Sequence, residues 1–305
     1  RALGEGQRAA HEHVARRARA EVELSSPFVR FTPDYRARLG RLLARLAAAR
    51  ERREGAGQAQ LFGTGSEFVG YRPYRSGEDL RALDWNLFAR LGRPYVRVSA
   101  REASEEWVVV VDTSASMGVG RPGKLQLAAE LAGALAALGV ARRATVELWL
   151  PGAPARCVAR KRAALEPWFA VLESLRAEGT AGLASAVGEL ARRRGAGRVF
   201  LVGDFLDLPG GGLAELARPS REVFLAQILA HEELTPPSSG SVRWIDAESG
   251  RSRALALDAS SVASYERRLA QRLTRLGREA VRRRARLGTW TSDTPFETLV
   301  AALCV

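Results

Sequence analysis

The segment WVVVVDTSAS at Trp107–Ser116 decides the fold of this chain. Its consecutive valines form an uninterrupted β-branched run, which is typical of a central strand in a helix-flanked sheet. The residue that ends such a strand lies at the carboxyl edge of the sheet, where open α/β sheets bind their ligands. That edge carries the carboxylate of Asp112 and the hydroxyls of Ser114 and Ser116. Hard oxygen atoms in one tight loop favour a hard divalent cation, Mg²⁺ or Mn²⁺, over zinc.

The composition indicates a folded globular protein, because 46% of its 305 residues are hydrophobic. No stretch approaches the roughly 18 apolar residues of a membrane span, and the first residues lack the apolar core of a signal peptide. We therefore expect a cytoplasmic location without a transmembrane segment. Cys157 and Cys304 are the only cysteines, which fits a reducing compartment without a disulfide framework.

The chain is strongly basic, with a formal net charge of +13, and all of its basic residues except Lys124 and Lys161 are arginines. The arginines are spread along the whole chain without the interleaved aromatic residues of a nucleic-acid module. We therefore expect a solvated basic face and no specific nucleic-acid site. A basic scaffold that binds anionic polymers is the alternative.

Three parts are expected along the chain: an arm at residues 1–26, an N-terminal region at 27–104 and an α/β domain at 105–305. A helix should begin at Pro33, and residues 63–100 are typical of loops and short strands, with one strand at 95–98. The arginines and acids between residues 71 and 90 predict either an ion-pair lattice or an exposed docking surface. Trp85 would be an anchor in either case.

The region after residue 105 alternates between strands and helices. Apolar patterning predicts helices at 123–141, 165–176 and 183–194, and strands at 145–150, 199–202 and 222–225. This order predicts a doubly wound, mostly parallel sheet flanked by helices, with an N-terminal helical and short-strand extension. A hairpin at 242–257 and a long basic helix at 261–286 should follow, with the apolar stripe of the helix packed on the sheet.

Two further loops could supply oxygen atoms to the same sheet edge. Thr180 lies just before the helix expected at Leu183, and Asp204 ends the buried strand at 199–202. Taken alone, Thr180 has the pattern of a helix N-cap and Asp204 that of a turn residue. Their order after the Asp112 loop is the stronger signal, because Asp204 would lie beside Asp112 if the two strands are neighbours.

This set of residues resembles the metal-ion-dependent adhesion site of a von Willebrand factor A domain. The pattern is D-x-S-x-S at Asp112, Ser114 and Ser116, followed by Thr180 and Asp204. The resemblance implies that the serines, with Thr180 or Asp204 depending on state, contact the ion directly. It also implies that Asp112 and Asp204 commonly act through water or hydrogen bonds, and that residues 105–305 form a von Willebrand A-like, Rossmann-like domain.

Flanking motifs resemble the bacterial domain of unknown function 58 family, von Willebrand A-like proteins often encoded beside MoxR-type AAA+ ATPases. They are Glu67-Phe68, Arg72-x-Tyr74, Gly77-Glu78-Asp79, Arg81, Asp84-Trp85, Ala89-Arg90, Asp246-x-Glu248-Ser249-Gly250 and Tyr265-Glu266. The chain departs from the family pattern at Gly203, where a serine is frequent, and at His231-Glu232-Glu233, which replaces a common Asp-Pro step. Neither departure removes an implied metal ligand.

The chemistry of this set favours recognition over catalysis, because neutral hydroxyl ligands leave a cation able to attract a carboxylate from a partner. No Ser or Thr follows Lys124, which excludes a P-loop, and the three histidines are scattered. A divalent-dependent phosphatase using Asp112 as nucleophile would want a second aspartate where Ser114 stands. We therefore expect a non-enzymatic protein-binding module, and the resemblance implies a MoxR-type ATPase or its client as the partner.

Overall fold

The computed structural model describes residues 28–55, 68–74, 83–99, 105–152, 156–193, 197–206, 208–216, 221–237 and 239–304. The predicted arm at residues 1–26 and the acids and arginines at 75–82 lie outside these ranges. The chain divides into two compact units, one of Arg1–Ala44 with Glu106–Val305 and one of Arg45–Glu105. Each unit is described by itself.

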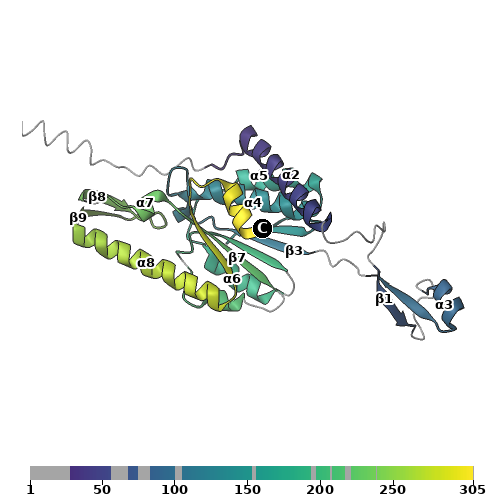
Figure 1. Ribbon diagram of the computed structural model, residues 1–305. Coiled ribbons are helices and arrows are strands. Elements are labelled where there is room, and N and C mark those ends of the chain that lie inside the picture. Colours follow the sequence, from purple (N-terminus) through teal and green to yellow (C-terminus); the bar gives the residue numbers. More distant parts are fainter. Residues whose placement is uncertain are drawn as a thin grey trace, which may run out of the picture. The chain divides into compact units, whose positions relative to one another are not determined.

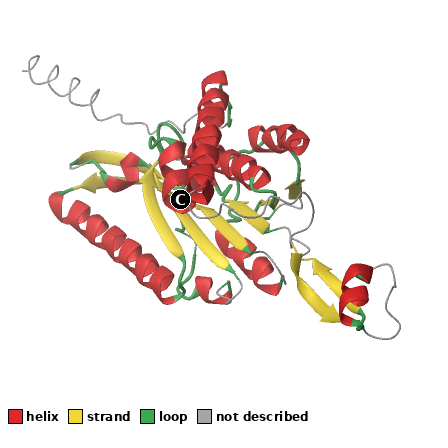
Figure 2. Ribbon diagram, turned by 45° about the vertical axis from the view of Figure 1, so that its right-hand side comes forward, coloured by secondary structure: helices red, strands yellow, loops and turns green. Residues whose placement is uncertain are grey.

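The larger unit is built on one six-stranded sheet with the strand order β10-β7-β6-β3-β4-β5 (Figures 1 and 2). The strands are β3 (Glu106–Val111), β4 (Thr145–Trp149), β5 (Arg156–Ala159), β6 (Arg198–Gly203), β7 (Glu222–Leu229) and β10 (Arg286–Thr291). Only β5 is antiparallel to its neighbour, β4. The expected α/β class with a mostly parallel sheet flanked by helices is therefore confirmed.

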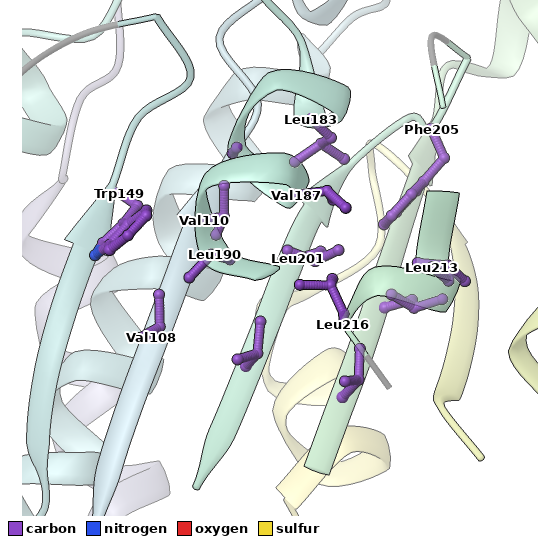
Figure 3. Packing of buried hydrophobic residues seen from close by; sticks show 14 of the residues in the cluster. Val108, Val110, Trp149, Leu183, Val187, Leu190, Leu201, Phe205, Leu213 and Leu216 are labelled. Atoms are coloured by element: carbon purple, nitrogen blue, oxygen red, sulfur yellow. The ribbon is translucent and has the colours of Figure 1, made fainter. Parts of the chain in front are cut away.

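The two faces of the sheet are covered by different helices. On one face, Val108 and Val110 of β3 belong to an apolar cluster with α6 (Leu183–Arg192), the short helix η4 (Gly212–Glu215) and the end of α8 (Ala259–Arg282), as Figure 3 shows in part. On the other face, α4 (Lys124–Ala141) packs on β3, β4, β6 and β7. Burial of both faces explains why β3 is apolar at every position after Glu106.

Helix α4 forms the centre of the second face, and 78% of it is buried. Its neighbours are α5 (Leu165–Glu173), α9 (Phe296–Cys304) and residues of α2 (Pro33–Gly55). Tyr35 of α2 donates a hydrogen bond to the Glu130 carbonyl, and the Tyr35 ring contacts Phe296 of α9. By length and composition α4 could span a membrane, contrary to our expectation that no stretch reaches that length, but here it is a core helix.

The predicted long basic helix at 261–286 ends about four residues too late. Helix α8 ends at Arg282, Arg284 adopts a left-handed φ of 56°, and residues 286–291 form β10 beside β7. The strands β1 and β5 and the helix α9 were not predicted at their positions. These elements are short, so hydrophobic periodicity has little length over which to act.

The predicted hairpin consists of β8 (Gly240–Ile245) and β9 (Ser252–Leu257), which pair antiparallel. Its Trp244 ring lies edge-on to Tyr265 of α8, with 5.8 Å between ring centroids. Farther along α8, Leu276 and Ala280 join the apolar cluster of the sheet. The expected packing of this helix on the sheet is thus confirmed only for its C-terminal part.

The smaller unit contains β1 (Phe68–Pro73) and β2 (Tyr95–Ser99), which pair antiparallel, and α3 (Trp85–Leu91). The Asp84 carboxylate caps α3 by accepting from the backbone N–H groups of residues 86 and 87. Trp85 is 60% exposed, and its role as an anchor stays a prediction. Most charged residues of the predicted ion-pair lattice lie outside the described residues.

Two short helices complete the larger unit near the ends of the parallel strands. The first, η2 (Ala115–Gly118), follows Ser114, and the second, α7 (His231–Leu234), follows β7. A further short helix, η3 (Arg162–Ala164), precedes α5. The first two bring polar side chains to one edge of the sheet.

Candidate functional site

The candidate site lies where the strand order of the sheet reverses. From β3 the chain moves to β4 and β5 on one side, and it then returns to β6, β7 and β10 on the other. Asp112 follows β3 and Asp204 follows β6, and these two strands pair in parallel with Val111 opposite Val202. The Asp112 N–H donates to the Val202 carbonyl at 2.8 Å. The strand adjacency that our sequence interpretation required is therefore present, at the position where such sheets bind ligands.

A chain of hydrogen bonds joins four of the five predicted residues. Asp112 Oδ1 accepts the N–H of Ser114 at 2.9 Å, which fixes the turn after β3. The Oγ atoms of Ser114 and Ser116 are 3.0 Å apart, and Ser116 Oγ donates to Asp204 Oδ2 at 2.8 Å. Asp112, Ser114 and Asp204 are buried, whereas Ser116 is half-buried. The oxygen atoms thus converge, and Ser116 connects them to the surface.

Thr180, the fifth predicted residue, is placed differently. Its loop is held against the Asp112 loop, because Glu178 N–H donates to the Thr113 carbonyl and Ala115 N–H donates to the Gly179 carbonyl, at 2.9 and 3.0 Å. The Thr180 side chain itself is exposed and has no hydrogen-bond partner among the described residues. It is also not the N-cap of α6, since Gly182 occupies that position. The backbone hydrogen bonds of Glu178 and Gly179 therefore place Thr180 at the rim of the site.

The structure adds a residue that sequence reasoning missed. Lys124, the first residue of α4, has a fully buried side chain. Its Nζ donates to Asp204 Oδ2 at 2.7 Å and to Glu233 Oε1 at 2.6 Å. Burial alone would lower the pKa of Lys124, but the charges of Asp204 and Glu233 outweigh that effect and raise its pKa above the usual value. An ammonium group therefore lies at the inner side of the candidate site.

Glu233 is fixed on both of its carboxylate oxygens. While Oε1 accepts from Lys124, Oε2 accepts the N–H of Ala230 at 2.7 Å, which caps the start of α7. The Tyr265 hydroxyl donates to the Glu233 carbonyl at 2.7 Å and so connects α7 to α8. Glu233 belongs to the segment that departs from the family pattern, and that departure was the only signal that pointed to it.

The other departure, Gly203, also has a geometric cause. A Cβ atom at position 203 would lie 2.6 Å from Asp112 Cβ and 2.9 Å from Asp112 Oδ2. A serine here would require the Asp112 loop or its neighbour Leu183 to move. Glycine allows the β3 and β6 loops to approach closely enough for Ser116 to contact Asp204.

The donor set fits a hard divalent cation. It consists of the hydroxyls of Ser114 and Ser116 with the carboxylates of Asp112 and Asp204, and oxygen donors of this kind suit Mg²⁺ or Mn²⁺. Within the described ranges, no three His, Cys, Asp or Glu side chains gather in a way that could hold a metal. Any cation here would therefore depend on the serine hydroxyls. The two carboxylates of Asp204 and Glu233 face one ammonium group, which leaves negative charge for a cation to balance.

Fold and site together define an α/β protein with a polar, partly buried cluster at the reversal of strand order. The model of the family described as "Protein of unknown function DUF58" matches residues 70–275. The match covers more than half of the chain, so the chain belongs to this family.

Two mycobacterial proteins, each described as an uncharacterized protein, are similar to this chain. Mb1516 of Mycobacterium bovis and Rv1480 of Mycobacterium tuberculosis H37Rv are each 30% identical to this chain over 219 residues. The matched residues are 64% of this chain, and the chain spans 65% of the length of these relatives.

Two solved structures are similar at a low level. One is the conserved hypothetical protein BatB of Bacteroides thetaiotaomicron, with a TM-score of 0.40 and 12% identity, covering 65% of this chain and 96% of that protein. The other is an aerotolerance-related membrane protein of Bacteroides fragilis, with a TM-score of 0.37 and 15% identity, covering 66% and 96%. Likeness this weak carries no weight for function.

Proposed function

We propose that this protein is a non-enzymatic, metal-dependent protein-binding module with a von Willebrand A-like domain at residues 105–305. Asp112, Ser114, Ser116, Thr180 and Asp204 would hold Mg²⁺ or Mn²⁺ in the manner of a metal-ion-dependent adhesion site. The observation that carries the proposal is the hydrogen-bonded series from Ser114 through Ser116 to Asp204 at the reversal of strand order. It brings hard oxygen donors from two separate loops to one point.

The carboxylates and the hydroxyls of the site have different roles, and this difference supports recognition. Asp112 holds the β3 turn by accepting the Ser114 N–H, and Asp204 holds the β6 turn by accepting the Leu206 N–H through Oδ1. The serine hydroxyls then face each other as neutral donors. A bound divalent ion would supply the positive charge that attracts a carboxylate of a partner protein.

The resemblance to proteins encoded beside MoxR-type AAA+ ATPases supports such an ATPase, or a client that it remodels, as the partner. The setting proposed for this pair is the cytoplasm. An Asp or Glu side chain of the partner would approach from the exposed rim formed by the Thr180 loop. Binding would then require both the metal ion and the partner's carboxylate.

Calorimetry with Mn²⁺ tests the metal site directly. We expect the wild type to bind Mn²⁺ and Asp112→Asn to bind it at least about tenfold more weakly, because the turn that presents Ser114 loses its charged acceptor. Asp246→Asn is a matched control, since Asp246 accepts from Glu248 N–H and Ser249 Oγ in an exposed turn of the hairpin. Equal Mn²⁺ affinity in the wild type and Asp112→Asn would refute the proposed site.

Capture of the partner is tested by a pull-down with the ATPase, with and without a chelator of divalent ions. We expect the chelator to release the partner and Asp112→Asn to mimic its effect. Binding that survives chelation would refute bridging through the metal, even if the ion itself binds.

The basic scaffold remains a second candidate function, because a specific groove favours it. A groove of about 660 Å³ lies between α8 and the loop after Asp204, with Arg268, Arg272 and Arg275 on its α8 side and Phe205 and Leu208 opposite. Arg272 donates to the Leu206 carbonyl at one end. Binding of an anionic polymer there would fall steeply with salt between about 50 and 200 mM, whereas partner capture through the metal would respond to the chelator.

A further inference from the structure

Lys124 places a permanent cation beside the candidate metal site. Its side chain is fully buried, and Nζ lies 2.7 Å from the same Oδ2 atom of Asp204 that accepts the Ser116 hydroxyl. A buried ammonium group is stable only where charge partners replace its lost hydration. Asp204 and Glu233 provide those partners, so Asp204 serves the ammonium and the serine loop at once.

We infer that Lys124 is the resident cation of the site, which keeps Asp204 in position without a divalent ion and competes with that ion for the Asp204 carboxylate. The competition rests on the proposed metal site. The positioning does not, because it follows from contacts that involve no ion. The chain would then hold a formed binding edge at all times, and its affinity for divalent ions would be set by Lys124.

The charges give the direction of the effect. Asp204 and Glu233 face one ammonium group, and replacement of Lys124 by an uncharged residue would add one unit of net negative charge. Coulomb attraction for a divalent ion inside a protein grows strongly with each such unit, so affinity should rise on the order of tenfold or more. It would also free Oδ2 of Asp204 from its closest cationic partner.

Glu233 makes this arrangement possible. It takes half of the ammonium's hydrogen bonding, and its own position is fixed by Ala230 N–H and by Tyr265 at its carbonyl. Lys124 is therefore held from α7 as well as from β6. If Asp204 were its only carboxylate partner, the ammonium group would bind Asp204 more strongly. With both carboxylates present, Asp204 can turn toward another cation while Lys124 stays bound to Glu233.

The chain offers a matched control for this inference, because Lys124 and Lys161 are its only lysines and Lys161 is exposed. We would measure thermal unfolding with and without Mg²⁺, and Mn²⁺ affinity by calorimetry, for the wild type, Lys124→Met and Lys161→Met. Lys124→Met should unfold at a lower temperature without ions, gain more from Mg²⁺ than the wild type, and bind Mn²⁺ at least about tenfold more tightly. Lys161→Met should match the wild type in all three.

A double variant distinguishes competition for Asp204 from a change in the net charge of the site. It also provides a test if Lys124→Met fails to fold. Lys124→Met with Glu233→Gln removes one positive and one negative charge, so the net charge of the site is unchanged. If Lys124 competes for Asp204, the double variant still binds Mn²⁺ more tightly than the wild type. Affinity equal to or weaker than the wild type in every folded variant lacking Lys124 would overturn the inference.

Lysine labelled with ¹³C at Cε provides a direct readout, because the wild type should give two side-chain signals. Substoichiometric Mn²⁺ should broaden the Lys124 signal by paramagnetic relaxation and leave the Lys161 signal sharp. If the wild type binds no Mn²⁺ but the variants without Lys124 do, the proposed metal-dependent function fails and the inference stands. If none of them binds Mn²⁺, the proposed function and the competition both fail, and the positioning of Asp204 also fails if Lys124→Met unfolds at the same temperature as the wild type.

Discussion

The inner and outer sides of the candidate site are built in different ways. The inner side, which we call the buried corner, consists of Asp204, Lys124 and Glu233, whose charged groups are tied together at 2.6 to 2.7 Å. The outer side, which we call the open rim, consists of Ser116 and Thr180, which are half-buried and exposed. The corner holds its geometry through charge pairs around a buried ammonium group, whereas the rim is held through backbone contacts and leaves hydroxyl groups open to a ligand.

This contrast separates support from contact. Substitutions in or beneath the corner should change stability strongly, because they strain the packing or leave a buried charge unpaired. Substitutions at the rim should leave stability nearly unchanged and alter ligand binding instead.

The largest of these effects is expected at Gly203, beneath the corner. Gly203→Ala would place a methyl group 2.6 Å from Asp112 Cβ and 2.9 Å from Leu183 Cδ1, so the two loops must separate. We expect a loss of about 1–3 kcal/mol in the free energy of unfolding, the usual range for overpacking. Urea unfolding followed by circular dichroism measures it.

Gly188 supplies the control for that substitution. It lies within α6, and a Cβ atom there would meet nothing within 4 Å. Gly188→Ala should therefore stabilise the protein by about 0.5–1 kcal/mol through helix propensity. If Gly203→Ala proved as harmless as Gly188→Ala, the loops would be looser than the structure shows, and the corner could not be considered rigid.

The strands of this fold could be predicted where a long apolar run leaves no alternative. The valines of β3 and the run at 199–202 fixed two neighbouring strands, and the polar residue after each strand then lies at one edge. β10 escaped prediction because its place beside β7 depends on residues about 60 positions away, and Thr289 contacts Gln227 only after folding. Periodicity detects local patterns and says nothing about such pairing.

The same difference explains why Lys124 and Glu233 of the corner were missed. A lysine at the start of a helix is usually solvated, and nothing near Lys124 in the sequence suggests burial. Its two carboxylate partners lie 80 and 109 positions away. The rim residues, by contrast, were predicted from short local motifs. The pattern of hydroxyl residues is visible in one segment of the sequence. The charged cluster of Lys124, Asp204 and Glu233 beside it forms only when three segments meet in the fold.

A smaller effect is expected at Ser116, where the corner meets the rim. Ser116→Ala removes the hydrogen bond to Asp204 Oδ2 but leaves Lys124 bound to the same oxygen. We expect a loss of about 1–2 kcal/mol in the free energy of unfolding, since the acceptor is charged and the site is half-buried. Chemical denaturation measures this loss.

Ser185 is the comparison for Ser116. Its hydroxyl donates to the Gly182 carbonyl at 2.9 Å, a neutral acceptor near the surface. Ser185→Ala should cost less than Ser116→Ala. Equal losses in the free energy of unfolding would mean that the charge of Asp204 does not strengthen its hydrogen bond with Ser116. The distinction between corner and rim would then fail where the two meet.

The smallest effect on stability is expected at Thr180, and it separates the two sides most clearly. Because the Thr180 side chain is exposed and its loop is held by the carbonyl of Gly179 and the N–H of Glu178, Thr180→Ala should change the free energy of unfolding by less than about 0.5 kcal/mol. Mn²⁺ affinity should nevertheless fall in Thr180→Ala and persist in Thr180→Ser, which keeps the hydroxyl. Calorimetry on both variants decides the matter: if Thr180→Ala bound Mn²⁺ as the wild type does, Thr180 would not be a ligand, and the rim would consist of Ser116 alone.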